Sequence, residues 1–198
     1  MKSEPASLLL SRGSWPGLLL GLSVTLAGCA SGPPPTFDLS PSAGPFSVRA
    51  QRGQLAIAEP VADVPIDSQR IVVRVQDDSV AFLRGAQWAD RLPSLVQTRL
   101  IETFENAHLL REVGRPGMAA NYTLSTEIRR FELAVGQNQA VVVIAAQLVN
   151  ATGKIVHGRV FSAKAPAVHD DGASATAALD QALSQVMQQI VVWAAPLI

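Results

Sequence analysis

Residues 122–165 read YTLSTEIRRFELAVGQNQAVVVIAAQLVNATGKIVHGRVFSAKA and carry the strongest structural signal in the chain. Three segments, 122–135, 140–149 and 155–165, are rich in β-branched and aliphatic residues. Only Gly136-Gln137-Asn138 and Asn150-Ala151-Thr152-Gly153 separate them. Connections this short join neighbouring antiparallel strands, so these residues predict an antiparallel meander.

The first segment of the meander changes the side to which its apolar residues point. Leu124 and Ile128 have one parity, whereas Phe131 and Leu133 have the opposite parity, and Arg129-Arg130 lies where the change occurs. Side chains alternate between the two faces of a strand, so one extra residue moves all later side chains to the other face. The pattern therefore predicts a β-bulge or a twist at the two arginines.

Two further segments have helical periodicity. Within Leu92–Ala107, apolar residues recur at positions 92, 95, 96, 100, 101, 104 and 107, and Pro93 occupies the first turn. A second helix is expected after Asp170-Asp171-Gly172, where a carboxylate can cap the amino terminus, and before Pro196. Its apolar stripe comprises Leu179, Ala182, Leu183, Val186, Met187, Ile190 and Trp193.

Shorter strands are predicted upstream, at residues 55–57, 71–75, 80–83 and 109–113. About six strands and two amphipathic helices indicate an α/β fold. We expect a two-layer sandwich, with a largely antiparallel sheet that carries both helices on one face. The composition, 48% hydrophobic and 16% charged, is adequate for a sizeable core.

The amino-terminal region divides into two parts before this domain, which we place at residues 54–198. Residues 15–27 are apolar but fall short of the roughly 20 residues that span a bilayer, so residues 1–28 are predicted to be a signal peptide. Residues 29–53 are rich in Pro, Gly and Ser, which predicts an extended tether.

The end of the apolar run, Leu26-Ala27-Gly28-Cys29, resembles a bacterial lipobox. In that reading the peptidase cuts before Cys29, the only cysteine of the chain, and the thiol carries a lipid. Several acyl chains together give lasting membrane attachment. The alternatives are an ordinary secretory signal with a chance cysteine, or an uncleaved anchor. By the same resemblance, Ala30 in place of an inner-membrane aspartate favours the outer membrane, facing the periplasm.

Motifs for catalysis, cofactors and nucleic acid are not found. The sequence has no G-x-S-x-G, P-loop or G-x-G-x-x-G motif, and His108, His157 and His169 stand in unrelated contexts. Its 16 basic and 16 acidic residues balance, and removal of Lys2, Arg12 and Glu4 with the signal leaves about −1. We therefore expect no enzymatic activity, no cofactor, no metal site and no nucleic-acid partner.

Three residues are candidates for docking a partner. Trp88 directly precedes the first helix, where an indole anchors either a corner of the core or a partner surface. Arg70 and Arg74 lie on one face of the predicted strand, opposite Ile71 and Val73. That face is either simply solvated, or a surface for docking or for lipid headgroups.

The order of these motifs resembles that of the ABC-type transport auxiliary lipoproteins, the PqiC-like family. The resemblance rests on the lipobox, the Pro-rich segment, Arg70-Ile-Val-Val-Arg74, and Trp88-Ala-Asp-Arg-Leu-Pro93 at the start of a helix. It covers nearly the whole chain after the signal peptide. Members typically have an aromatic residue before the arginine strand, whereas this chain has Ile66-Asp67-Ser68-Gln69.

The resemblance implies an outer-membrane lipoprotein that works with an MCE-domain protein and with the permease and ATPase of an ABC transporter. It would anchor or dock the conduit that carries phospholipid or other hydrophobic cargo across the periplasm. Assembly into a homo-oligomer, through edge strands or Trp88, is compatible with this role. The competing interpretations are a scaffold of another envelope machine, such as lipopolysaccharide assembly or a Tol-like system, and a lipid-binding module with a cavity of its own.

Overall fold

The computed structural model of the chain describes residues 33–75, 79–167 and 171–198. By its internal contacts the chain divides into Met1–Gly32 and Pro33–Ile198, and the second unit is the fold considered below. The predicted signal peptide and its lipobox lie outside the described residues, as do Asp77, Asp78, His169 and Asp170.

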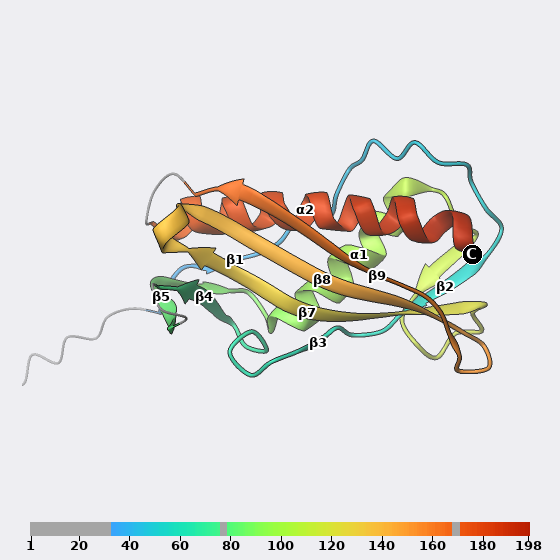
Figure 1. Ribbon diagram of the computed structural model, residues 1–198, viewed down its shortest axis with the longest axis horizontal. Coiled ribbons are helices and arrows are strands. Elements are labelled where there is room, and N and C mark those ends of the chain that lie inside the picture. Colours follow the sequence, from blue (N-terminus) through green and yellow to red (C-terminus); the bar gives the residue numbers. More distant parts are fainter. Residues whose placement is uncertain (1–32, 76–78, 168–170) are drawn as a thin grey trace, which may run out of the picture. The chain divides into compact units, whose positions relative to one another are not determined.

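Three long strands form the longest part of the sheet, and they confirm the predicted meander (Figure 1). β7 (Tyr122–Ala134), β8 (Gln139–Asn150) and β9 (Ile155–Pro166) pair antiparallel in that order. The second turn is held by the Asn150 side chain, whose Oδ1 accepts a hydrogen bond of 2.9 Å from the Lys154 amide.

The predicted bulge in β7 is confirmed. Pairing with β8 shifts in register between Ile128 and Arg130, so that Ile128 lies opposite Ile144 while Arg130 lies opposite Val143. The shift brings Phe131 to the same inner face as Ile128, and both side chains are buried.

Short strands pair with the other edge of β7, one after another along its length. β2 (Gln54–Ile57), β3 (Val61–Ala62) and β4 (Arg70–Arg74) all run parallel to it. β6 (Glu112–Gly114) adds parallel to β2. The sheet is therefore mixed: it is antiparallel along its three longest strands and largely parallel elsewhere.

The sheet ends beyond β4 in two more strands. β5 (Val80–Trp88) pairs antiparallel with β4 and extends beyond the predicted residues 80–83. β1 (Thr36–Phe37) then pairs parallel with the end of β5. Within the residues that the structure describes, the sheet has nine strands, with β1 and β9 on opposite sides of β7.

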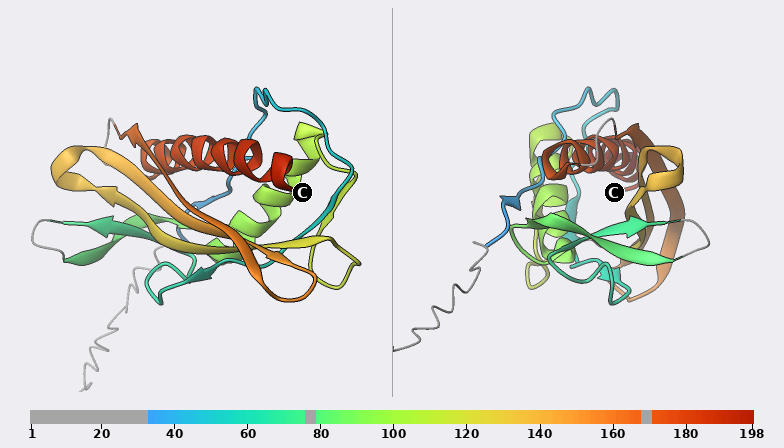
Figure 2. Two further views of the ribbon diagram at one scale, coloured as in Figure 1. Left: turned by 45° about the vertical axis from the view of Figure 1, so that its right-hand side comes forward. Right: turned by 90° about the vertical axis from the view of Figure 1, so that its left-hand side faces the viewer.

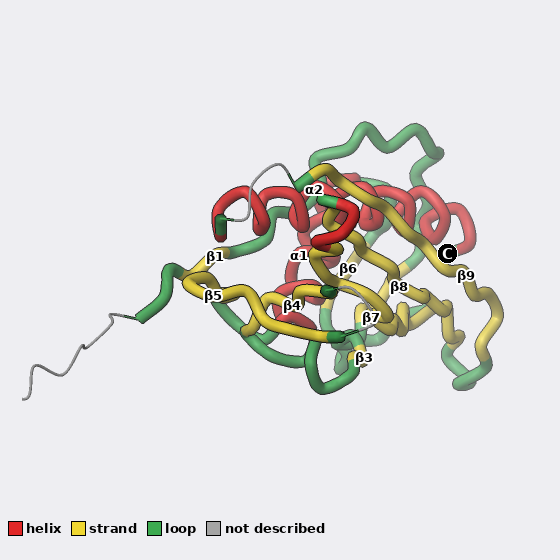
Figure 3. The backbone as a smooth tube through the Cα atoms, turned by 60° about the vertical axis from the view of Figure 1, so that its left-hand side comes forward, coloured by secondary structure: helices red, strands yellow, loops and turns green. Residues whose placement is uncertain are grey.

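Both predicted helices are present. α1 (Leu92–Ala107) has a proline in its first turn, and α2 (Gly172–Ala194) is capped by the Asp171 carboxylate, which accepts a hydrogen bond of 2.9 Å from the Ser174 amide. Figures 2 and 3 show both helices within the curve of the sheet, with α2 along β8 and β9. The fold is mixed α/β, with a multistranded sheet and two helices.

The core lies between the helices and the inner face of the sheet. Inward residues of β8, including Ile144 and Leu148, are fully buried, as is the stripe of α2 up to Ile190, whereas Trp193 is partly buried. Two edge-to-face aromatic pairs belong to this core. Trp88 packs on Phe131 with 5.8 Å between ring centroids, and Phe161 packs on Trp193 with 5.4 Å.

The described part of the predicted tether packs on the domain, unlike the free segment to residue 53 that its composition indicated. We call residues 38–46 the strap; it crosses α2 in Figure 1, and its Leu39 side chain is buried. Four polar contacts tie it to the helices: Asp38 to Arg99 (2.7 Å), the Ser40 amide to Asp180 (2.7 Å), the Ser42 amide to Thr103 Oγ1 (3.0 Å), and Gln188 to the Pro45 carbonyl (2.6 Å). Its few apolar side chains and these hydrogen bonds hold it in place despite its Pro and Gly content.

Candidate functional site

The point where the amino-terminal region joins the fold is well defined. The Gln87 amide donates 3.1 Å to the Pro35 carbonyl, and the Ala89 amide donates 2.7 Å to the Phe37 carbonyl. Thr36 is seven positions after Cys29, which is at most about 25 Å of extended chain. The predicted lipidation residue Cys29, with lipobox residues Leu26, Ala27 and Gly28, is outside the described part, but its attachment point on the sheet is fixed.

Of the three docking candidates, Trp88 is not at the surface. Its side chain is 1% exposed and packs edge-to-face on Phe131, because its place at the end of β5 points it into the core. The core-corner interpretation of this residue is correct, and the proposal that it contacts a partner directly is wrong.

Arg70 and Arg74 lie on the outer face of the sheet, as their spacing predicts. The Arg70 guanidinium carbon stands 3.3 Å above the centroid of the Phe82 ring, a cation–π contact. Phe82 lies opposite Val72 in the antiparallel β4–β5 pair, and Val80 lies opposite Arg74, so all these residues share the outer face.

Arg74 meets a second arginine through a buried carboxylate. Glu132 on β7 is 1% exposed, and its Oε1 accepts from Arg74 Nε at 2.9 Å and from Arg130 Nε at 2.7 Å. Burial raises the pKa of Glu132, but the hydrogen bonds from Arg74 and Arg130 outweigh it, so the pKa lies below the ordinary value. Both arginine side chains remain about one third exposed, at 32% and 40%.

We call Arg70, Arg74, Phe82, Arg130 and Glu132 the arginine face. Three guanidinium groups and one carboxylate thus share this part of the outer face. Sequence reasoning found Arg70 and Arg74 from their strand parity but missed the other three residues. The bulge at Arg129-Arg130 was the only available signal, because it turns Arg130 and Glu132 to the outer face.

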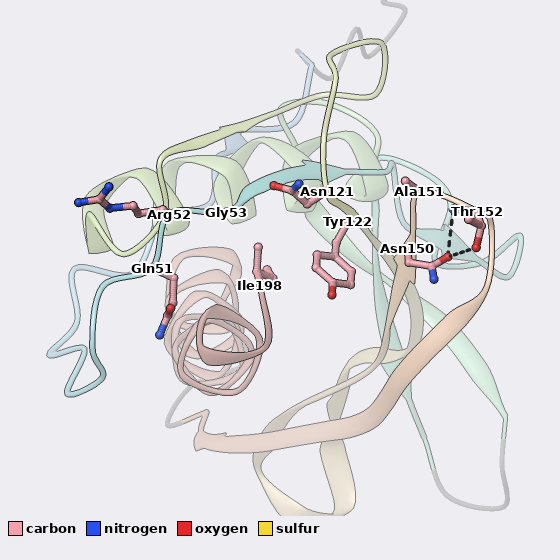
Figure 4. Close-up of a pocket in the computed structure, with 9 residues that line it drawn as sticks. All are labelled: Gln51, Arg52, Gly53, Asn121, Tyr122, Asn150, Ala151, Thr152 and Ile198. Atoms are coloured by element: carbon pink, nitrogen blue, oxygen red, sulfur yellow. Dashed lines mark hydrogen bonds between the residues drawn. The ribbon is translucent and has the colours of Figure 1, made fainter.

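A shallow hollow of about 620 Å³ lies at the other end of β7 (Figure 4). Its lining includes Gln51, Arg52, Asn121 and Tyr122, with the carboxy-terminal Ile198 between them. The hollow is open and mainly polar, and its lining contains no histidine, cysteine or carboxylate side chain. These lining residues do not form the nucleophile, base and orienting acid of a hydrolytic site.

The described histidines are apart from one another, with His108 at the end of α1 and His157 exposed on β9. Within the ranges that the structure describes, no three His, Cys, Asp or Glu side chains gather as metal ligands. In those same ranges no helix is long and apolar enough to cross a membrane.

Most of the described residues match a known protein family. Residues 37–191, from β1 almost to the end of α2, match the family described as ABC-type transport auxiliary lipoprotein component. The chain belongs to this family. The resemblance based on the arginine strand and the Trp88 motif is thereby confirmed.

One curated relative matches nearly the whole chain. The lipoprotein is 32% identical over 198 residues to an uncharacterized protein of Bradyrhizobium diazoefficiens, a match that covers 97% of this chain and 53% of that protein. The chain thus spans about half the length of this curated relative.

Solved structures share the fold. Protein XCC0632 of Xanthomonas campestris is 28% identical with a TM-score of 0.71, over 82% of the auxiliary lipoprotein and 93% of that chain. The hypothetical protein CT253 of Chlamydia trachomatis has a TM-score of 0.52 at 8% identity, over 73% and 96% of the two chains, which shows likeness of fold alone.

Proposed function

We propose that this protein is the outer-membrane accessory subunit of an MCE-type ABC transport system. A lipid on Cys29 would hold it in the membrane, and the folded unit would dock the periplasmic conduit for phospholipid or other hydrophobic cargo. The observation that carries the proposal is the family match over residues 37–191. The lipobox ahead of the matched region supports the anchor.

The packing supports docking rather than carrying of cargo, and we propose no catalytic role. The apolar groove between Val73, Leu83, Leu133 and Ala167 holds about 150 Å³. Pockets that enclose a drug-sized ligand usually hold about 300–1,000 Å³. This groove is too small to shelter a lipid, so the surface is the better candidate for function.

Self-association through β9 is part of the same proposal. β9 pairs with β8 along one side and with no other strand of the described chain, so its second side presents free backbone groups. Residues 155–160 are exposed on both faces, and Ile155 and Val160 are 53% and 51% exposed. An apolar edge of this kind can pair with a second copy of the chain.

Partner capture tests the main proposal. The lipidated protein would be cross-linked in cells, purified, and its partners identified by mass spectrometry, with Cys29→Ala as the unanchored control. Recovery of an MCE-domain protein together with a permease and an ATPase, reduced in the control, is the expected result.

Two other outcomes would replace this proposal. Recovery of only lipopolysaccharide-assembly or Tol components would assign the protein to another envelope machine. Copurification of stoichiometric lipid with the folded unit, without protein partners, would favour a lipid-binding module.

A further inference from the structure

The folded unit is joined to its amino-terminal region at one edge of the sheet. β1 pairs only with β5, and Figure 2 shows it beside the β4–β5 pair, on the side away from β9. Because Cys29 is seven residues before Thr36, a lipid there lies within about 25 Å of this edge. A membrane that holds the lipid is therefore within reach of β5 and its neighbours.

The surface beside this edge is the arginine face. β5 contributes Phe82, with Arg70 stacked on its ring, and Arg74 and Arg130 lie on the next two strands of the sheet order. Val80 of β5 shares this face and is 43% exposed. The face thus combines cations, an aromatic ring and an exposed aliphatic side chain.

We propose that the arginine face lies against the phosphate groups of the bilayer that holds the Cys29 lipid. The proposal rests on the lipid anchor of the proposed function. It adds which surface of the domain faces the membrane, and consequently that β9 and the hollow around Tyr122 face away from it.

The chemistry of the face matches a headgroup layer. Guanidinium groups donate paired hydrogen bonds to phosphate oxygens, and long arginine side chains place their stems on apolar surface while the charge stays in the polar layer. Aromatic rings favour the same depth. Glu132 spaces Arg74 and Arg130 by holding both at one oxygen.

The contact is expected with zwitterionic as well as anionic lipids. Both kinds of lipid carry a phosphate group that accepts hydrogen bonds from a guanidinium group. Recognition therefore depends on individual phosphate groups near Arg70 and Arg130 rather than on the overall charge of the membrane.

A single fluorescent label tests the orientation. The acylated full-length protein is reconstituted into vesicles of phosphatidylethanolamine and phosphatidylglycerol that contain a lipid with a headgroup-level quencher. Acylation occupies Cys29, so Val80→Cys or, as the matched control, Ile155→Cys on β9 supplies the only free thiol for the label. We expect strong quenching at position 80 and little at position 155.

A charge variant then tests the arginine itself. Arg70→Gln, combined with the label at position 80, should reduce the ratio of quenched to unquenched protein about fivefold, the effect of one cation near a phosphate surface. Arg159→Gln is the control, because Arg159 also stacks over an aromatic ring, Phe161 at 5.3 Å, but on β9. It should leave the quenching unchanged.

The outcomes separate this proposal from the proposed function. The intact mass of each sample reports whether Cys29 is acylated. Acylated protein with equal quenching at both positions, or stronger quenching at 155, overturns the orientation and leaves the anchor intact. A Cys29 that carries no lipid overturns the anchor and the orientation together.

Discussion

Among single side chains, Glu132 combines the deepest burial with a formal charge. Its replacement by Gln keeps the shape but removes the charge that Arg74 and Arg130 share. We expect the free energy of unfolding at pH 7 to fall by about 2 kcal/mol, the value typical of hydrogen bonds to a charged group. Urea denaturation measures it.

The same carboxylate gives a pH dependence with a defined sign. Because the pKa of Glu132 is lowered in the folded state, its stabilising effect is complete above the ordinary carboxyl pKa. The effect is lost as the pH falls below that value and through the lowered pKa. The stability difference between wild type and Glu132→Gln should therefore shrink in acid, and a difference that grows in acid would contradict this.

Trp88 and Arg70 should respond differently to truncation, because one is buried and the other lies on the surface. Trp88→Ala removes a fully buried indole and should cost about 3–5 kcal/mol. Arg70→Ala loses a surface cation–π contact and should cost about 1 kcal/mol or less. Thermal unfolding followed by circular dichroism compares the two, and equal losses would refute the assignment.

Among the elements, the strap depends on one hydroxyl of α1. Thr103 Oγ1 accepts from the Ser42 amide and donates 2.6 Å to the Arg99 carbonyl. Thr103→Val keeps the shape but leaves that amide without its acceptor, so amides of the strap should exchange with deuterium faster. Thr98→Val, in the same helix, is the control and should leave exchange in the strap as in wild type.

The carboxy-terminal turn packs on a glycine that tolerates no side chain. A Cβ at Gly53 would overlap Ile198 Cγ2 and would lie 2.7 Å from the Ile198 carbonyl oxygen. Gly53→Ala should lower stability by about 1–3 kcal/mol. Removal of Ile198 should restore most of this loss in a denaturation experiment, and Gly136→Ala, where nothing lies within 4 Å, should be close to neutral.

Elements with a local signal could be predicted from the sequence. The turns around Gly136 and Asn150, the parity change in β7 and the stripe of α2 each lie within a few residues, where periodicity and turn chemistry decide. β1 and β3 have two residues each and no periodicity, so only their parallel partners define them.

The arginine face could be predicted only in part, because some of its residues are far apart in the sequence. Strand parity placed Arg70 and Arg74 on one face, but Glu132 is 58 residues away from Arg74 and no local pattern joins them. The Pro- and Gly-rich composition of the strap did not indicate that it packs on the domain. Separate contacts with α1 and α2 hold it, and these leave no periodic pattern in the sequence.

For the complete protein, the free edge of β9 predicts association between copies. Val160→Lys places a charge on that edge, which should shift the lipidated protein in detergent towards the monomer in analytical ultracentrifugation. Val64→Lys, at a position 85% exposed outside the strands, should not change the distribution. A wild-type protein that stays monomeric at all concentrations would exclude this use of β9.

The pairing of β1 with β5 also has a mechanical consequence. Tension on a lipid at Cys29 would pull along β1, and the hydrogen bonds to β5 lie across the strand, so they would be loaded in shear and share the force. Beyond them, the Asp38, Ser40 and Ser42 contacts would load next, each on a helix. The protein would thus resist a pulling force between the membrane and whatever the domain binds, because its first strand would not detach one hydrogen bond at a time.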